Sequence, residues 1–347
     1  MKAWGTVLQI AFTYIGTIVG AGFATGQEIL QFFTRYGWMA TITIILSGLL
    51  FVWLGTKVML LAHRIQAASY EDLNRFLFGP RLGKAFSLFS LVVLFGINAV
   101  MLAGAGSVFQ EHFSLAYQYG LLLTMMLAYL VIHGGLKALM AVNSLVVPMM
   151  FLFSVLMVTA TIGSPNAGNW LTWTSDYSPV RIWTAPFLYV AFNLATAQAV
   201  LVPLGAATKN PLLLKRGGWL GGIGISLMLL GGHFALSSQM PGIAQFEIPM
   251  SHLIGRLGQG LQLAFVAVIF GEIFTTLIAN VYGLTLQLRQ RLDLSYNWLV
   301  AGILLTSYAV SQIGFSTLLS TLYPLFGLVS MLWFVRMLRP RGAAPPM

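Results

Sequence analysis

The sequence predicts an all-α polytopic membrane protein with ten transmembrane helices in a 5+5 inverted repeat, with the first and sixth helices discontinuous. Three observations predict this fold: an apolar composition, ten apolar segments of membrane-spanning length, and motifs that recur five segments later. Charged residues make up 7% of the 347 residues and apolar residues 58%, whereas about 25% of residues are charged in soluble domains. The mean hydropathy is +0.85, so lipid is the expected solvent of most of the chain.

The apolar segments account for nearly the whole chain. A helix needs about 20 mostly apolar residues to cross the hydrocarbon core of a bilayer. The segments that meet this requirement are residues 4–33, 37–62, 84–110, 116–132, 138–162, 184–205, 212–238, 259–287, 296–312 and 315–338. Because the connectors between them are short, we expect a single transmembrane domain over residues 1–347 and no soluble domain.

Lysine and arginine residues are distributed unevenly over the connectors. When the N-terminus is placed inside, 15 of the 18 basic residues fall in cytoplasmic segments, and only Arg35, Arg181 and Arg256 fall outside. Cytoplasmic loops carry such an excess of basic residues, so we expect a multi-pass protein of the cell inner (plasma) membrane with both termini cytoplasmic. The net charge of +10 is then an orientation signal, and no nucleic acid is expected as a partner.

Three pairs of short motifs indicate an internal repeat. They are FTYIGTIVGAG (12–22) with FLYVAFNLATA (187–197), VLFG (93–96) with VIFG (268–271), and Gly37-Trp38 with Gly218-Trp219, at shifts of 175, 175 and 181 residues. These shifts correspond to five spans. Because five is odd, the two halves must cross the membrane in opposite directions, as in secondary transporters. The alternative is that the two halves share only their apolar composition.

The repeat sets the expected boundaries within the domain. Repeat one covers about residues 1–162 and repeat two about 184–338, and residues 339–347 form a short cytoplasmic tail. A partner segment in the second half also argues against the alternative in which the first residues are a cleavable signal peptide.

The first span is unusually rich in glycine. Gly16, Gly20, Gly22 and Gly26 lie within eleven residues, and each glycine costs a helix about 1 kcal/mol relative to alanine. The span is therefore predicted to unwind here, and the freed N–H and C=O groups can hold an anionic group and a cation. Glycines four residues apart also fit the alternative of close helix packing.

The sixth span carries polar residues at the equivalent depth. Asn193, Thr196 and Gln198 follow one another closely, and Pro203 comes one turn later. Broken helices at bilayer depth are tolerated where they are buried in protein or line a cavity. We therefore predict a second interruption that faces the first.

Two carboxylates fall within predicted spans, Glu28 and Glu272. A central acid costs about 3 kcal/mol on insertion scales, so each is a candidate for ion or proton coupling. Glu272, Thr275 and Thr276 share one helical face, and their oxygens suit Na⁺ or a proton relay. The alternative is a protonated carboxyl group bonded to a neighbouring helix, with threonine hydroxyls bonded to their own backbone. Asn98 in the third span either faces the solute as a hydrogen-bond donor or makes a structural bond between helices.

Motifs in three spans carry a family resemblance. GTIVGAGFATGQEILQFF in span one, YVAFNLATAQAVLVPLG in span six and GEIFTT in span eight resemble the YkvI-like bacterial membrane proteins. These belong to the amino acid–polyamine–organocation superfamily with the LeuT-type fold. The resemblance covers nearly the whole chain in span count, although only these three spans carry specific motifs. It implies a substrate held between the broken first and sixth helices.

The resemblance also implies roles for individual residues. The backbone of Gly20, Ala21 and Gly22 would bind a substrate carboxylate, faced by Asn193, Ala195 and Thr196. A sodium site would draw on Gly16, Val19, Glu272, Thr275 and Thr276. A glutamate stands here where sodium-coupled relatives usually have a small residue, so proton coupling, alone or with sodium, becomes credible.

The sequence thus predicts an ion-coupled secondary active transporter of an amino acid or similar small zwitterionic solute, driven by Na⁺, H⁺ or both and needing no other cofactor. Its expected partners are the solute and the bilayer. An enzyme is not expected, because H-E-x-x-H and G-x-S-x-G are missing, no predicted span holds a closely spaced acid pair, and no cysteine is present. A transporter-like sensor that binds solute without moving it, and a channel, remain as alternatives.

Overall fold

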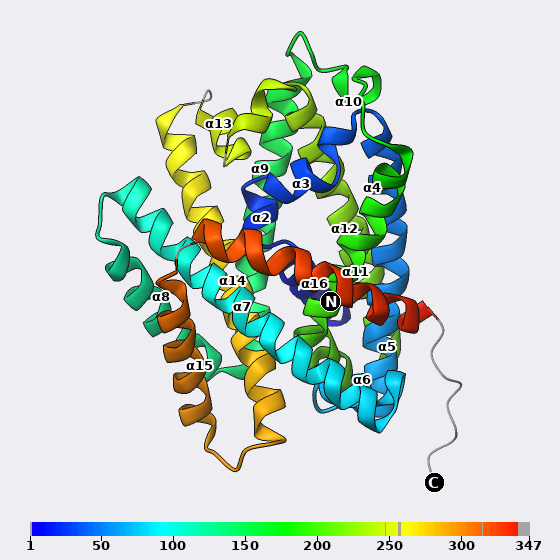
Figure 1. Cartoon of the computed structure of the whole chain (residues 1–347), viewed down its shortest axis with the longest axis vertical. Helices are drawn as coiled ribbons and strands as arrows, with labels where there is room; N and C mark the ends of the chain where they lie inside the picture. Colours follow the sequence, from blue (N-terminus) through cyan, green and yellow to red (C-terminus); the bar gives the residue numbers. More distant parts are fainter. Residues whose placement is uncertain (1, 247, 256–257, 314, 339–347) are drawn as a thin grey trace.

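We describe a computed structural model of the chain, which covers residues 2–246, 248–255, 258–313 and 315–338. Throughout these residues the chain forms helices, turns and irregular connections (Figure 1). The α-helices are α1 (Lys2–Ile18), α2 (Ala21–Ala24), α3 (Gln27–Phe32), α4 (Met39–Leu50), α5 (Thr56–Ile65), α6 (Tyr70–Phe78), α7 (Pro80–Phe113), α8 (Tyr117–Ile132), α9 (Gly135–Ile162), α10 (Asn169–Thr172), α11 (Pro179–Ala207), α12 (Pro211–Ser237), α13 (Pro249–Gly255), α14 (Gln259–Arg289), α15 (Tyr296–Ser311) and α16 (Phe315–Leu338). The 3₁₀-helices are η1 (Thr34–Tyr36) and η3 (Gly242–Gln245), and η2 (Phe51–Gly55) is a π-helical turn that joins α4 to α5.

Long apolar helices dominate the molecule. Within the described residues, six helical segments are long and apolar enough to cross a membrane: Met39–Ile65, Pro80–Gln110, Gly135–Ile162, Pro179–Ala207, Pro211–Ser237 and Gln259–Arg289. Large apolar side chains on their outer faces are exposed, including Leu49 (64% exposed) and Leu152 (58% exposed). A surface of this kind suits lipid, because a soluble protein rarely exposes wide apolar patches. The predicted tail, residues 339–347, lies outside the described residues.

The first predicted span consists of three helices, α1, α2 and α3. The helical hydrogen bonds of α1 end with Val19 N–H to the Ile15 carbonyl (2.7 Å), and the pattern resumes with Ala24 N–H to the Gly20 carbonyl (3.0 Å). Gly20 between them is extended, with φ −109° and ψ −167°. Gly26, between α2 and α3, has a positive φ of 85° that favours glycine. The chain therefore changes direction twice inside one apolar segment.

The sixth predicted span, in contrast, is one continuous helix, α11. The predicted discontinuity of this span is wrong for this structure. The Asn193 amide donates to the Tyr189 carbonyl (3.0 Å), and the Thr196 hydroxyl donates to the Phe192 and Asn193 carbonyls (3.2 and 2.9 Å). The polar side chains thus bond their own helix backbone. Alanine, the best helix former, fills much of the rest of this stretch.

Short helices close the two ends of the molecule. α10 and α13 lie at the upper end in Figure 1, and α6 lies at the lower end. The loop before α13 and the start of α13 cover the interrupted first span, because Gln27 Nε2 donates to the Phe246 carbonyl (2.8 Å) and Met250 N–H donates to the Thr25 carbonyl (3.0 Å). One end of the first span is therefore tied to a loop more than 200 residues away in sequence.

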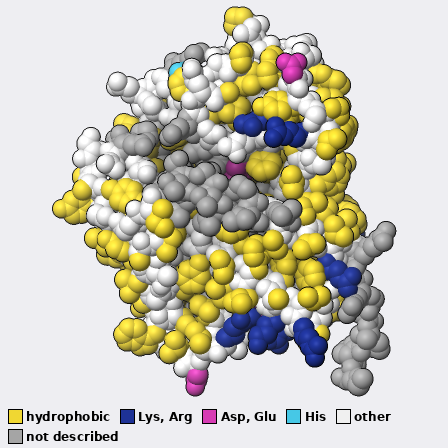
Figure 2. Space-filling view, viewed as in Figure 1, with side chains coloured by type: hydrophobic (Ala, Val, Ile, Leu, Met, Phe, Trp, Pro, Cys, Tyr) yellow, Lys and Arg dark blue, Asp and Glu magenta, His cyan; other side chains and the backbone are white. Residues whose placement is uncertain are grey.

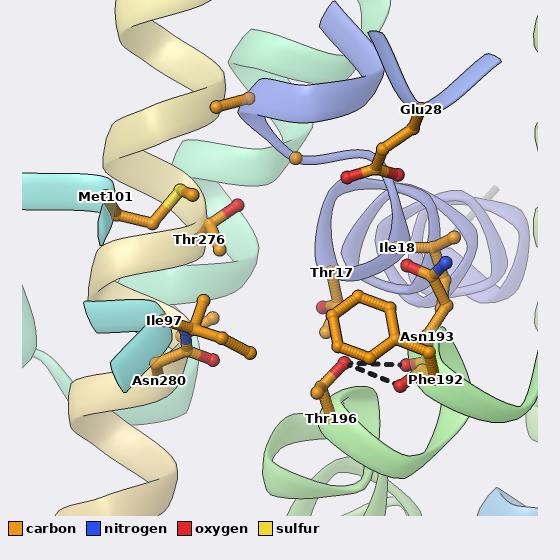
Figure 3. A pocket seen from close by; sticks show the side chains of 13 residues that line it. Thr17, Ile18, Glu28, Ile97, Met101, Phe192, Asn193, Thr196, Thr276 and Asn280 are labelled. Atoms are coloured by element: carbon orange, nitrogen blue, oxygen red, sulfur yellow. Dashed lines mark hydrogen bonds between the residues drawn. The ribbon is translucent and has the colours of Figure 1, made fainter. Parts of the chain in front are cut away.

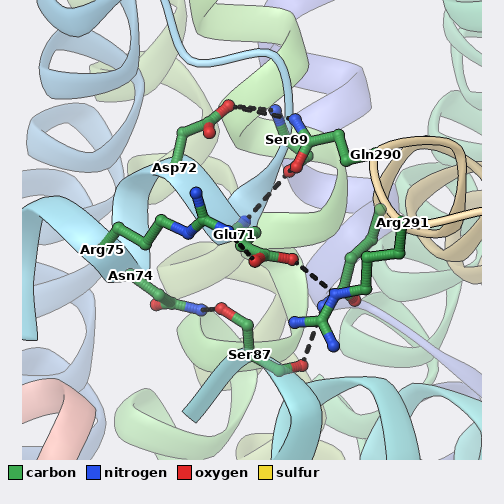
Figure 4. Close-up of polar contacts among 9 residues, drawn as sticks. Ser69, Glu71, Asp72, Asn74, Arg75, Ser87, Gln290 and Arg291 are labelled. Atoms are coloured by element: carbon green, nitrogen blue, oxygen red, sulfur yellow. Dashed lines mark hydrogen bonds and ion pairs between the residues drawn. The ribbon is translucent and has the colours of Figure 1, made fainter. Parts of the chain in front are cut away.

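α6 is held by a charged network at the other end (Figure 4). The Glu71 side chain is 1% exposed and accepts from Arg75 Nη2 (2.7 Å) and from Arg291 Nε (2.9 Å), the latter just beyond α14. Gln290 beside it accepts from the Ser69 hydroxyl (2.9 Å) and donates to the Asp72 carboxylate (3.2 Å). Burial alone raises the pKa of Glu71, but the bonds to both arginines outweigh it and hold the pKa below its usual value. The network joins α6 to the end of α14.

Glycine residues let α12 approach η2 closely. A Cβ atom placed on Gly222 would lie 2.6 Å from both the Cα and the N atom of Val52 in η2. We expect Gly222→Leu to force the two helices apart and to lower the unfolding free energy by about 1–3 kcal/mol, as overpacking does. Thermal unfolding of the purified protein in detergent measures this as a fall of several degrees in Tm.

Gly302 in α15 offers a matched control for this prediction. It is also a helical glycine, but a Cβ atom placed on it meets nothing within 4 Å. Gly302→Leu should therefore leave Tm unchanged or raise it slightly. Equal effects of the two substitutions would contradict the close packing at Gly222.

Candidate functional site

A small cavity lies beside the interruption of the first span (Figure 3). It holds about 40 Å³ of free space, which is enough for water but far below the roughly 300 Å³ or more of typical ligand pockets. Its walls come from α1, α2, α3, α7, α11, α14 and Gly20 between α1 and α2. The lining residues are Thr17, Ile18, Gly20, Ala21, Glu28, Ile97, Met101, Phe192, Asn193, Thr196, Thr276, Ala279 and Asn280.

The Glu28 carboxyl group projects from α3 back toward the interruption. Its Cγ atom would lie 2.8 Å from a Cβ atom placed on Gly22, so glycine at this position makes room for the side chain. The Tyr189 side chain of α11 lies close to the carboxyl group. Oε2 of Glu28 is buried and has no hydrogen-bond partner among the described residues. None of the described residues that line the cavity is basic, so no positive side chain among them compensates the carboxylate.

Two α14 side chains form the opposite wall with unused polar atoms. Thr276 Oγ1 and Asn280 Nδ2 are buried without a hydrogen-bond partner among the described residues. Thr276 Oγ1 is also close to the interruption, 3.2 Å from a Cβ atom placed on Gly20. Because the two residues are one helical turn apart, they face the cavity together. The wall offers one hydroxyl and one amide to a bound molecule.

The structure brings most of the predicted solute-site residues together. Gly20, Ala21, Asn193 and Thr196 line the cavity, and so does Glu28, which was predicted as a coupling residue. The interruption places the first two opposite the polar face of α11, where Asn193 and Thr196 are four and seven residues beyond Tyr189. The four predicted solute-site residues and Glu28 therefore lie around one space.

Three predicted solute-site residues do not line the cavity. Gly22 packs against the Glu28 side chain instead, and Ala195, 7% exposed, is not among the lining residues. Asn98 is fully buried, and its Nδ2 donates to the Ser307 hydroxyl of α15 (3.3 Å). In this structure Asn98 therefore makes a bond between α7 and α15.

The predicted cation ligands are divided between two places. Thr276 faces the cavity, whereas Glu272, one turn earlier on α14, is 0% exposed and does not line it. Both Glu272 carboxyl oxygens lack a hydrogen-bond partner among the described residues. The Thr275 hydroxyl donates to the Glu272 backbone carbonyl (3.0 Å), so it is bonded within its own helix. Val19 is fully buried at the end of α1.

Gly16 lies against an α9 residue that the sequence did not single out. A Cβ atom placed on Gly16 would overlap the Asn143 side chain and lie 3.0 Å from Val147. Asn143 is 0% exposed, and its Oδ1 has no hydrogen-bond partner among the described residues. The unused carboxyl, amide and hydroxyl oxygens of Glu272, Asn143 and Thr276 are hard donors of the kind that Na⁺ takes.

Sequence reasoning missed several cavity residues, and only some of them carry a signal. Asn280 extends the α14 face by one turn beyond Thr276, so the same helical spacing could have found it. Thr17 precedes the interruption directly. Ile97 and Met101 are apolar residues of an apolar helix, and nothing in the sequence separates them from lipid-facing or core residues.

Comparison with known proteins identifies the family. The chain is 39% identical to the Bacillus subtilis membrane protein YkvI over 331 residues, which are 94% of each protein. The chain belongs to the YkvI family. This YkvI-family protein is also 26% identical to the Bacillus subtilis protein YyaD over 339 residues, 96% of this chain and 97% of YyaD. No family model matches the chain.

Solved structures show the fold of this YkvI-family protein. MhsT in complex with L-phenylalanine aligns with a TM-score of 0.66 over 95% of this chain and 87% of MhsT, at 13% identity. Mhp1, a nucleobase-cation-symport-1 family transporter, aligns with a TM-score of 0.63 over 97% of this chain and 81% of Mhp1, at 15% identity. An Eremococcus coleocola manganese transporter aligns with a TM-score of 0.63 over 96% of this chain and 75% of the transporter, at 12% identity. The prediction of a multi-pass membrane protein with the LeuT-type fold is confirmed.

Proposed function

We propose that this YkvI-family protein is an ion-coupled secondary active transporter of an amino acid or a similar small zwitterion. The observation that carries the proposal is the Glu28 carboxyl group, which has an unpaired buried oxygen and opens on a cavity at the interruption of the first span. A carboxylate at membrane depth costs about 3 kcal/mol on insertion scales, and carboxylates that are kept there despite this cost mark ion or proton pathways. The proposal explains why this cost is tolerated.

The two chemical ends of a zwitterion match the two kinds of group at the interruption. The N–H groups at the start of α2 have no partner within that helix and suit a carboxylate. The carbonyl groups that end α1, together with Glu28, suit an ammonium group. Thr196, Asn193 and Asn280 then supply neutral hydrogen-bonding groups around the solute. Because the cavity is small in this conformation, binding and release require α1–α3 to move relative to α14, as alternating access does.

Coupling is assigned to the two membrane carboxylates. Glu28 would bind a proton or pair with the solute, and Glu272 would bind H⁺ or Na⁺ with help from the α1 carbonyl groups, Asn143 and Thr276.

We also propose that residues 1–162 and 184–338 are inverted halves. Most lysine and arginine side chains visible in Figure 2 gather at the lower end of the molecule. This supports an orientation with that end and both termini in the cytoplasm of the cell.

Uptake into proteoliposomes tests the proposal. The purified protein is reconstituted and given each of the twenty amino acids in radiolabelled form, under an inward Na⁺ gradient, an inward proton gradient, or neither. At least one amino acid is expected to accumulate above equilibrium with one gradient and to equilibrate without it. Saturable binding of an amino acid with no accumulation under any gradient would instead indicate a sensor. If the protein neither binds nor accumulates any amino acid, the proposal is contradicted.

A further inference from the structure

A second concave feature lies on the outer surface, between η2–α5 and α12. This groove has a volume of about 510 Å³. Three basic residues line it, Lys57, Arg64 and Lys215, together with two tryptophans, Trp53 and Trp219. None of its lining residues belongs to the cavity at the first span. The groove is therefore a separate feature of the molecule.

The two walls of the groove carry the same pair of side chains in mirrored order. Lys57 follows Trp53 by one turn, and its ammonium group lies 5.4 Å from the indole centroid. Lys215 precedes Trp219 by one turn and lies 5.2 Å from that indole centroid. Distances of this size allow a cation–π attraction that holds the lysine over the ring. Because α5 ends and α12 begins at the same end of the molecule, both lysines lie nearer that end than their tryptophans.

The positive charge of the groove has no acidic counterpart. No aspartate or glutamate lines it, and both ion pairs found among the described residues belong to Glu71. Lys57 donates to the Met337 and Leu338 carbonyls (2.9 and 3.4 Å), which are neutral groups. Arg64 and Lys215 are exposed. Three cations therefore surround a space that no acidic side chain of the described residues lines.

The surface around the groove is apolar and faces lipid. Trp53 and Trp219 are half-exposed, and Leu49 and Ile223 on the same helices are 64% and 48% exposed. Tryptophan and lysine together mark the depth where lipid headgroups meet acyl chains. Basic pockets between membrane helices at this depth suit the headgroups of anionic lipids. The groove thus has a cationic end toward water and an apolar end toward the bilayer core.

We propose that this groove binds an anionic glycerophospholipid. Its phosphate lies between Lys57, Arg64 and Lys215, and its glycerol backbone and first acyl carbons lie against Trp53 and Trp219. The lipid bridges α5 and α12 on the outside of the molecule. This assignment depends on the membrane location of the protein and is independent of whether the protein transports a solute.

Thermal stability of the delipidated protein in detergent tests the proposal. Phosphatidylglycerol, phosphatidylcholine and inorganic phosphate are titrated separately while Tm is measured. Phosphatidylglycerol is expected to raise Tm to a saturating value, and the other two are expected to leave it unchanged. An equal rise with phosphatidylcholine would exclude recognition of the negative charge. A rise with inorganic phosphate alone would indicate a simple anion site and overturn the assignment of a lipid.

Two double variants locate the effect. Arg64→Gln with Lys215→Gln removes two exposed cations of the groove and keeps Lys57, which bonds the end of α16. This variant is expected to need about 30-fold more phosphatidylglycerol for the same shift. The control, Arg81→Gln with Lys84→Gln, removes two exposed cations of α7 outside the groove and should behave as wild type. Equal weakening in both variants would attribute the effect to general surface charge and overturn the proposal.

Discussion

Glu28→Gln is expected to reduce gradient-driven uptake by roughly 100-fold, because a charged hydrogen-bonding group to the solute contributes about 1.5–3 kcal/mol. Glutamine keeps the shape of the side chain in the space that Gly22 leaves, but it cannot pair with an ammonium group or carry a proton. Because Glu28 lines the cavity, solute binding and coupling should fall together. The measurement is uptake and equilibrium exchange of the amino acid that the wild-type protein accumulates most.

Glu272→Gln separates binding from coupling in the same assay. Glu272 does not line the cavity, so this variant should still exchange solute across the membrane at equilibrium but should not accumulate it against a gradient. Asp293→Asn is the matched control, because it removes one exposed acid beyond α14. Accumulation at the wild-type level by Glu272→Gln would remove this residue from the mechanism. Full uptake by Glu28→Gln would contradict a role for Glu28 in transport, on which the proposed function depends.

Six of the ten predicted spans correspond to helices that are long and apolar enough to cross a membrane, because lipid imposes a simple length and polarity requirement. The interruption of the first span was also foreseeable, since Gly16, Gly20, Gly22 and Gly26 all weaken one helix. The sixth span shows the limit of this reasoning. Asn193 and Thr196 were read as signs of a break, but their side chains bond the carbonyls of their own helix. Polarity at membrane depth does not by itself distinguish an unwound segment from an intact helix.

Partners that are distant in the chain could not be predicted at all. Asn98 bonds Ser307 across 209 residues, and only the fold decides whether it faces solute or another helix. α6 is a different case, because Ser69 and Asp72 form a capping box that marks its start. This capping box is visible in the sequence, but the nine residues of α6 are too few to cross a membrane, so the helix does not stand out as a span.

Glu71→Gln is expected to cause the largest loss of stability of any single substitution at the α6 end, about 3 kcal/mol, because it leaves Arg291 without its counter-charge at a largely buried position. Arg75 contributes less, since its side chain is 53% exposed. Thermal unfolding in detergent at pH 7 measures the loss. Adding Arg291→Gln to Glu71→Gln should restore part of it, because the unpaired cation is then removed as well. Asp176→Asn, which changes an exposed acid, should have little effect.

The pH dependence of unfolding identifies the charge of Glu71 as the cause. The folded state lowers the pKa of Glu71, so the unfolded state takes up the proton first as pH falls. The stabilisation is complete above the unfolded pKa of about 4.3 and is lost as pH falls through the lower folded value. The difference in Tm between wild type and Glu71→Gln should therefore be large at pH 7 and should shrink at the lowest pH that the detergent-solubilised protein tolerates. A difference that stays constant over this range would mean that Glu71 stabilises α6 through its shape and hydrogen bonds, without a contribution from its charge.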